Sequence, residues 1–304
     1  MRRLDWMLMI IVFAVSIGLR MLTGEAPSSD NPRRPSAERF TPEKQSAGVW
    51  DRETWDWLTA RPTPMNNGGP GGLPREGIVK EDHKPGDTSG TAFSVSAEGY
   101  WLTARHVAEG CKTISIQVQE RSVIKVNRTI LHPRADVAML ITKRAPAPLV
   151  LATAVGAQDA FNVGFPAGQP GAVHTRYMGE MTLRHKGGRI RGGGYREVVN
   201  AWSEQSRVPA LTGSLGGISG GVVLDGSGQV IGVVQAESRR RGRVMTAQTK
   251  TLREMFNHAK FTPVSSGETL ERSALEGNLT GDTYPTTARN LILSRRVAKV
   301  LCHS

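Results

Sequence analysis

Cysteine is scarce in this sequence, which contains two in 304 residues, Cys111 and Cys302. Two cysteines are too few for a disulfide scaffold and lack the spacing of metal ligands, so a small disulfide-rich domain and a cysteine-based metal site are both excluded. In an oxidising compartment they could pair and tie the C-terminal segment to the region of His106; two unpaired buried thiols fit the sequence equally well. Aromatic residues are also few, at 6%.

Acidic residues are outnumbered by basic ones. The chain has 39 Lys and Arg against 27 Asp and Glu, a formal net charge of +12, which favours contact with lipid headgroups, nucleic acid or an acidic substrate. Nucleic-acid binding is not favoured, because no recognisable motif or aromatic stacking platform accompanies the charge. Two basic stretches are each either a docking surface for an acidic partner or anionic lipid, or a solvated loop. They contain Arg184, His185, Lys186, Arg189 and Arg191, and then Arg239, Arg240, Arg241 and Arg243.

A long apolar run occurs once, near the N-terminus. Trp6 to Leu22 cover seventeen residues, with arginines before the run and Arg20 near its end. A helix of that length rises about 25 Å, enough to span a bilayer if Arg20 extends its charge to the interface. We therefore predict a transmembrane helix, with residues 1–24 as a membrane anchor. A cleaved signal peptide is the alternative, which we disfavour because the small-residue cleavage positions are poor.

The remaining chain divides by composition. Residues 25–75 are rich in proline, glycine and charge and predict a linker, with a short Trp-rich helix over 48–60. In residues 76–261, short β-branched runs alternate with Gly, Asn and Asp, as in GTAFSVS, DVAMLIT and QVIGVVQA. Many short strands without interleaved helices predict an all-β sandwich or barrels. Residues 262–304 are a C-terminal extension that ends in a predicted amphipathic helix, ARNLILSRRVAKVLCHS.

Three short blocks in the β-rich region stand out: Thr103-Ala104-Arg105-His106, Asp136-Val137-Ala138 and Gly217-Ile218-Ser219-Gly220-Gly221. They match, in order, the T-A-x-H, D-[VIL]-A and G-x-S-G-G motifs of the chymotrypsin-like (trypsin-like) serine peptidases, with the closer likeness to the bacterial HtrA/Deg branch. Their separations, 30 and 83 residues, suit a His and an Asp in one barrel and a Ser in the next. The resemblance covers about residues 76–261, and no PDZ-like domain is expected after them.

The resemblance implies two six-stranded antiparallel β-barrels, with the active site in the cleft between them and no metal or cofactor. It implies that Ser219 is the nucleophile, His106 the general base and then acid, and Asp136 the carboxylate that orients His106. A serine hydroxyl needs a base to take its proton, an imidazole titrates near neutrality, and a carboxylate fixes its tautomer. The ordinary alternatives are a core histidine, a turn-capping aspartate and a serine in a glycine-rich turn.

By the same resemblance, the oxyanion hole consists of the backbone N–H groups of Gly217 and Ser219, each worth about 3–4 kcal/mol in the transition state. Glycine at position 217 permits the required backbone twist. Ile218 departs from the family, whose members usually carry Asp or Asn before the nucleophile. An isoleucine cannot pair with a new N-terminus, so activation by trypsin-type cleavage is not expected.

The sequence gives little information about substrate recognition. The resemblance implies a primary pocket with two sides. One wall is Gly213, Ser214, Leu215 and Gly216, and the facing strand contains Gln235, Ala236 and Glu237. An extended substrate should add to that strand through its backbone. No acid lies in the first wall, so a Lys or Arg preference is not expected. Leu215 and Ala236 favour a small or medium apolar P1 residue, unless Glu237 points into the pocket.

We therefore predict a serine endopeptidase that cleaves polypeptides through an acyl-enzyme. Its anchor would lie in a bacterial inner membrane as a single pass, with the catalytic domain in the periplasm. Two alternatives stay open. Ile218 also fits a catalytically silent, membrane-anchored binding protein on a peptidase scaffold, and the charge also fits a basic envelope protein that binds nucleic acid. The sequence carries no signal for an oligomeric state.

Overall fold

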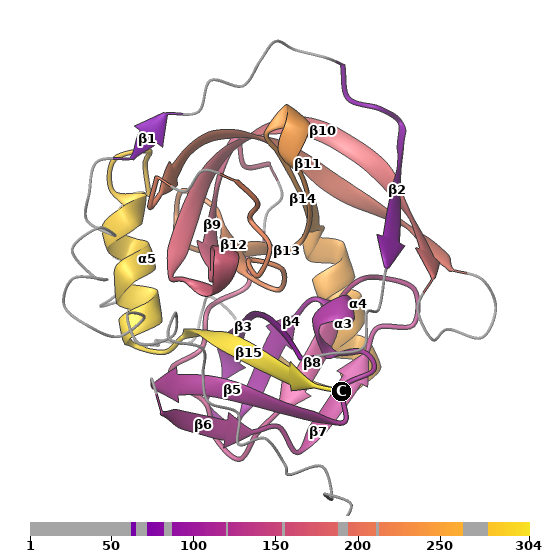
Figure 1. The fold of residues 1–304 in the computed structure, drawn as a ribbon, viewed down its shortest axis with the longest axis vertical. Helices are drawn as coiled ribbons and strands as arrows, with labels where there is room; N and C mark the ends of the chain where they lie inside the picture. Colours follow the sequence, from indigo (N-terminus) through magenta and orange to yellow (C-terminus); the bar gives the residue numbers. More distant parts are fainter. Residues whose placement is uncertain are drawn as a thin grey trace, which may run out of the picture. The chain divides into compact units, whose positions relative to one another are not determined.

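The computed structural model describes residues 62–64, 72–81, 87–119, 121–153, 156–187, 194–210, 213–263 and 279–304. The predicted anchor over residues 1–24 and the predicted Trp-rich helix over 48–60 lie outside these ranges. No helix within the ranges is long and apolar enough to cross a membrane. They form an all-β structure with few helices, so the predicted fold class is confirmed in outline (Figure 1).

The first barrel has its strands in the order β6-β5-β15-β3-β4-β8-β7. They are β3 (Thr88–Ser96), β4 (Tyr100–Thr103), β5 (Thr113–Gln119), β6 (Ser122–Lys125), β7 (Arg128–Leu131), β8 (Ala138–Ile141) and β15 (Val297–His303). Between β6 and β7, Val126 N–H donates to the Ile114 carbonyl at 3.0 Å, and Asn127 N–H donates to the Ile141 carbonyl at 2.8 Å. β6 and β7 therefore form one bent strand that closes the barrel at six strand positions.

The second barrel is also a ring of six strands, because β10 pairs with both β9 and β11. Its members are β9 (Asp159–Gly164), β10 (Gly171–Gly187), β11 (Tyr195–Val208), β12 (Val222–Leu224), β13 (Val230–Ser238) and β14 (Arg243–Ala247). Two strands lie outside the ring: β1 (Thr63–Pro64) pairs with β11, and β2 (Glu76–Glu81) runs parallel to β10. All pairings within the ring are antiparallel, as predicted, and only the added strand β2 is parallel to its neighbour. β1 falls within the predicted linker.

The C-terminal segment corrects the prediction of a helix over residues 288–304. The chain instead forms α5 (Tyr284–Leu293) and then β15, which lies between β3 and β5 in the first barrel (Figure 1). Val297 and Val300 are fully buried, as suits β-branched residues in a central strand. Cys302 in β15 forms a disulfide with Cys111. Of the two possibilities that the sequence left open, a disulfide or two unpaired buried thiols, the structure therefore has the disulfide.

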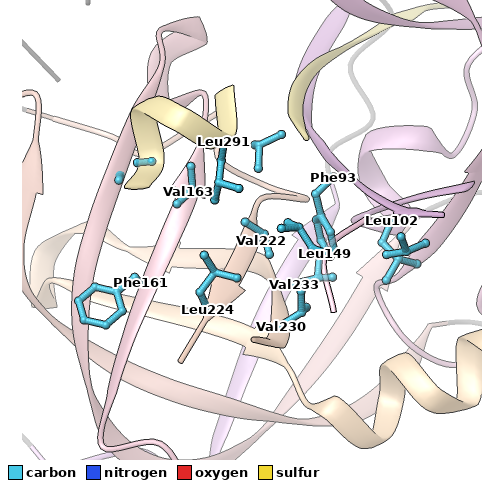
Figure 2. Close-up of a cluster of buried hydrophobic side chains, with 14 of the residues drawn as sticks. Phe93, Leu102, Leu149, Phe161, Val163, Val222, Leu224, Val230, Val233 and Leu291 are labelled. Carbon is cyan, nitrogen blue, oxygen red and sulfur yellow. The ribbon is translucent and has the colours of Figure 1, made fainter. Parts of the chain in front are cut away.

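Both barrels contribute to one apolar core. Its largest cluster joins Phe93 and Leu102 of the first barrel with Val163, Val222 and Val233 of the second, and Figure 2 shows these side chains gathered together. Burial of an apolar side chain of this size contributes about 1.5–3 kcal/mol. The cluster therefore fixes the barrels against each other and, with them, the loops that carry the motif residues. Two helices, α4 (Thr249–Ala259) and α5, also bury residues in it.

Candidate active site

His106 and Asp136 come from neighbouring loops of the first barrel. His106 is the second residue of the one-turn helix α3 (Arg105–Ala108), which follows β4, and Asp136 lies just before β8. The Asp136 carboxylate accepts the backbone N–H of His106 at 2.9 Å and contacts its ring Nδ1 at 2.7 Å. Because an ionised carboxylate only accepts hydrogen bonds, the ring proton belongs on Nδ1. Nε2 is then the basic nitrogen of the imidazole.

The carboxylate is buried and the imidazole is not. Asp136 is 1% exposed, whereas 30% of the His106 side chain is exposed. Burial alone would raise the pKa of the Asp136 carboxyl, but the charge of His106 and the hydrogen bonds from it outweigh burial and lower that pKa below its ordinary value. Asp136 is therefore ionised at neutral pH, beside an imidazole that remains partly accessible.

Ser219 lies in the turn before β12, in the second barrel, and is partly buried. Its carbonyl accepts the N–H of Thr91 at 2.8 Å. At the next residue, Gly220, φ is +84°, and a Cβ would lie 2.1 Å from the Thr91 carbonyl oxygen and 2.9 Å from the Ala104 nitrogen. Only glycine permits so close an approach. It sets the Ser219 turn against the backbone two residues before His106, so the structure brings the three predicted residues to one region.

The backbone N–H groups around Ser219 fall into two sets. Those of Ile218 and Gly220 donate to carbonyls of the second barrel at 2.9 and 2.8 Å. Those of Gly217 and Ser219 donate to no backbone carbonyl among the residues that the structure describes. These two N–H groups are the ones that the resemblance assigns to the oxyanion hole.

The conformation of Gly217 is fixed from several sides. Its φ is +96°, and a Cβ there would lie 2.6 Å from the Phe165 carbonyl oxygen. The Gly216 carbonyl accepts the N–H of Ala167 at 2.6 Å, so across this planar peptide the Gly217 N–H points away from Ala167. Thr91, which the sequence did not single out, donates its hydroxyl to the Gly217 carbonyl at 2.8 Å. The first barrel thus holds the glycine-rich loop of the second.

Ile218 is buried, with 3% of its surface exposed. It packs in an apolar cluster of the second barrel with Leu215, Val223 and Val234. A Cβ on Gly164 would lie 3.0 Å from Ile218 Cγ1, so the glycine makes room for this side chain. Apolar burial, worth about 1.5–3 kcal/mol for a side chain of this size, therefore holds the position where the family usually has a polar residue.

Two residues that the sequence did not place at the site lie behind Asp136. Both carboxylate oxygens of Glu197, in β11, accept the Asp136 N–H at 3.2 Å, and His185 Nε2, in β10, lies 2.8 Å from Glu197 Oε1. Burial raises the pKa of the Glu197 carboxyl, the hydrogen bond from His185 opposes that rise, and the charge of Asp136 adds to it. His185 is 1% exposed, which corrects its assignment to a basic surface stretch.

The predicted primary pocket differs from expectation on both walls. Leu215 is 2% exposed and packs into the core, so its side chain does not line an open pocket. Glu237 reaches across from the facing strand: one oxygen accepts the Leu215 N–H at 2.7 Å, and the other accepts the Ser214 hydroxyl. Behind them, the Gly213 carbonyl accepts Arg207 Nη1 at 3.2 Å. An acid therefore does reach this wall, which is the alternative that the sequence left open for Glu237.

The facing strand, β13, has an edge that continues past its partner. β12 pairs with β13 only up to Val233 in the ladder that the structure describes. Ala236 and Glu237 lie beyond that point, while on the other edge they pair with β14. Gln235 is buried, and its Nε2 donates to the Asp136 carbonyl at 3.2 Å. Gly216 is exposed on the opposite wall.

The basic stretches are only partly at the surface. Arg184 and Lys186 are exposed, whereas Arg189 and Arg191 lie outside the described residues. In the second stretch Arg239 and Arg241 are exposed. Arg243 is 6% exposed, so it does not belong to a docking surface. Among the described residues, no group of three or more His, Cys, Asp or Glu side chains is placed to hold a metal ion.

Comparison with known proteins shows that this chain is similar to one peptidase family. Residues 90–233 match the model of the trypsin-like peptidase domain. A probable periplasmic serine endoprotease, DegP-like, from Ectopseudomonas mendocina (strain ymp) is 28% identical over 189 residues, which cover 61% of this chain and 35% of that protein. This chain therefore spans about a third of the length of that curated relative. These matches confirm the resemblance inferred from the three motifs.

Solved structures with similar folds include two peptidases. The active form of the Rv3671c protease from M. tuberculosis shares 20% identity at a TM-score of 0.48, covering 64% of this chain and 94% of that one. The HtrA-type protease AlgW with a decapeptide shares 21% identity at a TM-score of 0.44, covering 56% of this chain and 51% of that one.

Proposed function

Because the chain carries a trypsin-like peptidase domain over residues 90–233, we propose that it is a serine endopeptidase with His106, Asp136 and Ser219 as its catalytic triad. One observation carries the assignment of roles. Asp136 holds His106 through two hydrogen bonds, of 2.9 and 2.7 Å, in the region where the Ser219 turn packs against Ala104. A base that is oriented by an acid, and a serine in a glycine-rich turn that packs near it, are the two parts that a catalytic triad needs.

The reaction proceeds through an acyl-enzyme. His106 Nε2 takes the hydroxyl proton as Ser219 Oγ bonds to the scissile carbonyl carbon, and the imidazolium is stabilised by Asp136. The negatively charged oxygen of the tetrahedral intermediate accepts hydrogen bonds from the backbone N–H groups of Gly217 and Ser219. His106 then gives its proton to the leaving amine as the peptide bond breaks. A water, deprotonated by His106 in its turn, attacks the acyl group and releases Ser219.

Recognition uses the open edge of β13 and the pocket beside it. An extended substrate adds its backbone along Ala236 and Glu237, which lie past the end of the β12 pairing. The Glu237 carboxylate, bonded to Ser214 and Leu215, supplies a negative charge at this wall of the pocket. A basic P1 side chain gains an ion pair with it, whereas an apolar one only removes water from it. The substrate class is therefore polypeptide with Lys or Arg at P1.

A serine-reactive fluorophosphonate probe tests the proposal on the purified full-length chain. We expect labelling of the wild type and none of Ser219→Ala, with peptide hydrolysis reduced about a millionfold in the variant. The matched control is Ser227→Ala, because Ser227 is likewise a serine in a glycine-rich turn, where it is exposed and bonded to Asp225. A folded wild type that neither labels nor hydrolyses peptides would favour the silent scaffold instead.

The proposal includes a location. The DegP-like relative is described as probably periplasmic, and the Cys111–Cys302 disulfide persists in an oxidising compartment. Residues 1–24 would tether the enzyme to the inner membrane. In intact spheroplasts we expect added protease to digest the catalytic domain. Without added protease, we expect the full-length chain to sediment with the membranes. Deletion of residues 1–24 behind a cleavable signal peptide should release it, and a chain that stays protected inside spheroplasts would refute the location.

A further inference from the structure

Asp136 is held by its backbone as well as by its side chain. Its N–H donates to both oxygens of Glu197 at 3.2 Å, and its carbonyl accepts Gln235 Nε2 at 3.2 Å. Glu197 belongs to β11 and Gln235 to β13, so both partners come from the second barrel, whereas Asp136 belongs to the first. The loop that presents the triad acid is therefore fastened across the junction between the barrels.

Glu197 is itself fixed from two further directions. His185 Nε2 lies 2.8 Å from one of its oxygens, and Gln235 Nε2 lies 3.2 Å from the other. The imidazole of His185 stacks on Tyr195 with ring centroids 4.3 Å apart, and the two residues face each other in the β10–β11 ladder. All partners of the carboxylate named here are donors, and Glu197 is 8% exposed. Its position is thus set by rigid strands, not by a loop.

A buried carboxylate at this place destabilises the folded state, so a purely structural contact would not favour one. Burying one charge close to another carboxylate opposes folding, and an apolar side chain of similar volume is often neutral or better in such a position. What a carboxylate provides is directional acceptance of three donors at once. That property matters where the loop must be held to a fraction of an ångström, as a reacting group requires.

We infer that Glu197, fixed by His185 and Gln235, is a positioning residue that holds the Asp136 loop in the orientation His106 needs. The inference rests on the proposed function, in which Asp136 is the triad acid. It makes catalysis depend on residues of the β10–β11 hairpin that lie behind Asp136. It also assigns a role to Gln235 other than the substrate contact expected from the sequence.

Kinetics of Glu197→Ala and His185→Ala in the full-length chain test this role. We expect kcat for a peptide substrate to fall about 10- to 100-fold with KM nearly unchanged, because no substrate contact is removed. Glu197→Gln keeps one carbonyl acceptor for the Asp136 N–H and should recover much of the loss. The matched controls are Val198→Ala, the exposed neighbour on β11, and His174→Ala, which removes a similar pair with Asp159 at 2.8 Å away from the triad.

The decisive comparison repeats Glu197→Ala in an Asp136→Asn background. If Glu197 acts through the Asp136 carboxylate, its effect on kcat should nearly vanish there. An equal effect in both backgrounds, or a loss no larger than that of Val198→Ala and His174→Ala, overturns the inference while the wild type stays active. A wild type that shows no serine-dependent hydrolysis overturns the proposed function as well. If Glu197→Ala does not fold, as near-ultraviolet circular dichroism would show, Glu197→Gln and His185→Ala decide.

Discussion

The disulfide between Cys111 and Cys302 should contribute more to stability than any single side-chain contact in the first barrel. It ties β15 to the segment after α3, across a separation of 191 residues. Restriction of the unfolded chain by a loop of that length is worth about 5 kcal/mol at 25 °C. Because β15 lies between β3 and β5, the bond holds a central strand, so its loss affects the whole barrel.

Guanidinium chloride unfolding with and without reductant measures this contribution. With a slope of about 5 kcal/mol per molar at this size, the midpoint should fall by about 1 M on reduction. A Cys111→Ser/Cys302→Ser variant is the control: it should unfold at the lower midpoint and should not respond to reductant. Tryptophan fluorescence can follow the transition, because Trp101 and Trp202 report on the two barrels.

Three results would refute the reasoning. Titration of the native protein, before any reductant is added, should detect no reactive thiol; two thiols would mean that the bond does not form. Equal midpoints in the oxidised and reduced protein would mean that the chain-restriction argument fails for this loop. A midpoint that falls on reduction in the double serine variant would assign the effect to something other than this bond.

Three further predictions concern the site. Folding lowers the pKa of Asp136 below 3.8, so its stabilising effect is present above that pH and is lost as pH falls through the folded value. Urea unfolding at a series of acid pH values should show that the free energy of unfolding falls less steeply with decreasing pH in Asp136→Asn than in the wild type. An unchanged dependence on pH would contradict this. Glu237→Ala should lower kcat/KM for Lys relative to Ala at P1 about 10-fold, measured with matched peptides; an unchanged ratio would remove Glu237 from the pocket. Gly220→Ala, which overlaps the Thr91 carbonyl, should abolish probe labelling, whereas Gly226→Ala, whose nearest neighbour would be 3.7 Å away, should not.

The sequence predicts the residues whose chemistry is local. His106, Asp136 and Ser219 stand in short motifs, because an oriented base and a nucleophile in a tight turn each require particular neighbours. Their flanking glycines follow from the same need: Gly217 and Gly220 have φ of +96° and +84°, which few other residues tolerate. Short alternating runs separated by turn residues predict a sandwich or barrels, whereas the two six-strand rings are what the resemblance to the peptidase family implies.

Contacts set by strand register could not be predicted in this way. Glu197 lies in β11, opposite Leu183 of β10, and contacts Asp136 of the other barrel, and nothing near Glu197 in the sequence marks that outcome. The sequence places Glu237 on the strand that faces the pocket but leaves the direction of its side chain open, since that direction depends on the twist of β13. These residues are close in space and distant along the chain, so local pattern carries no information about them.

The end of the chain shows a different limit. Residues 288–304 contain apolar positions compatible with both a helix and a strand, and short apolar runs are ambiguous on periodicity alone. The strand prevails in residues 297–303 because β3 and β5 offer hydrogen bonds on both of its sides. Tertiary pairing therefore overrides local preference, and it does so with a partner almost 200 residues earlier in the chain.

The place of β15 has a consequence for when activity begins. Ribosomes deliver β3 to β8 long before residues 297–303 exist, and those early strands lack their central member until the entire second barrel has been synthesised. Domains that depend on such distant pairings fold late and slowly. Until residues 297–303 are made, the loops that carry His106 and Asp136 belong to an unfinished barrel, so under the proposed function we expect a nascent chain to be inactive.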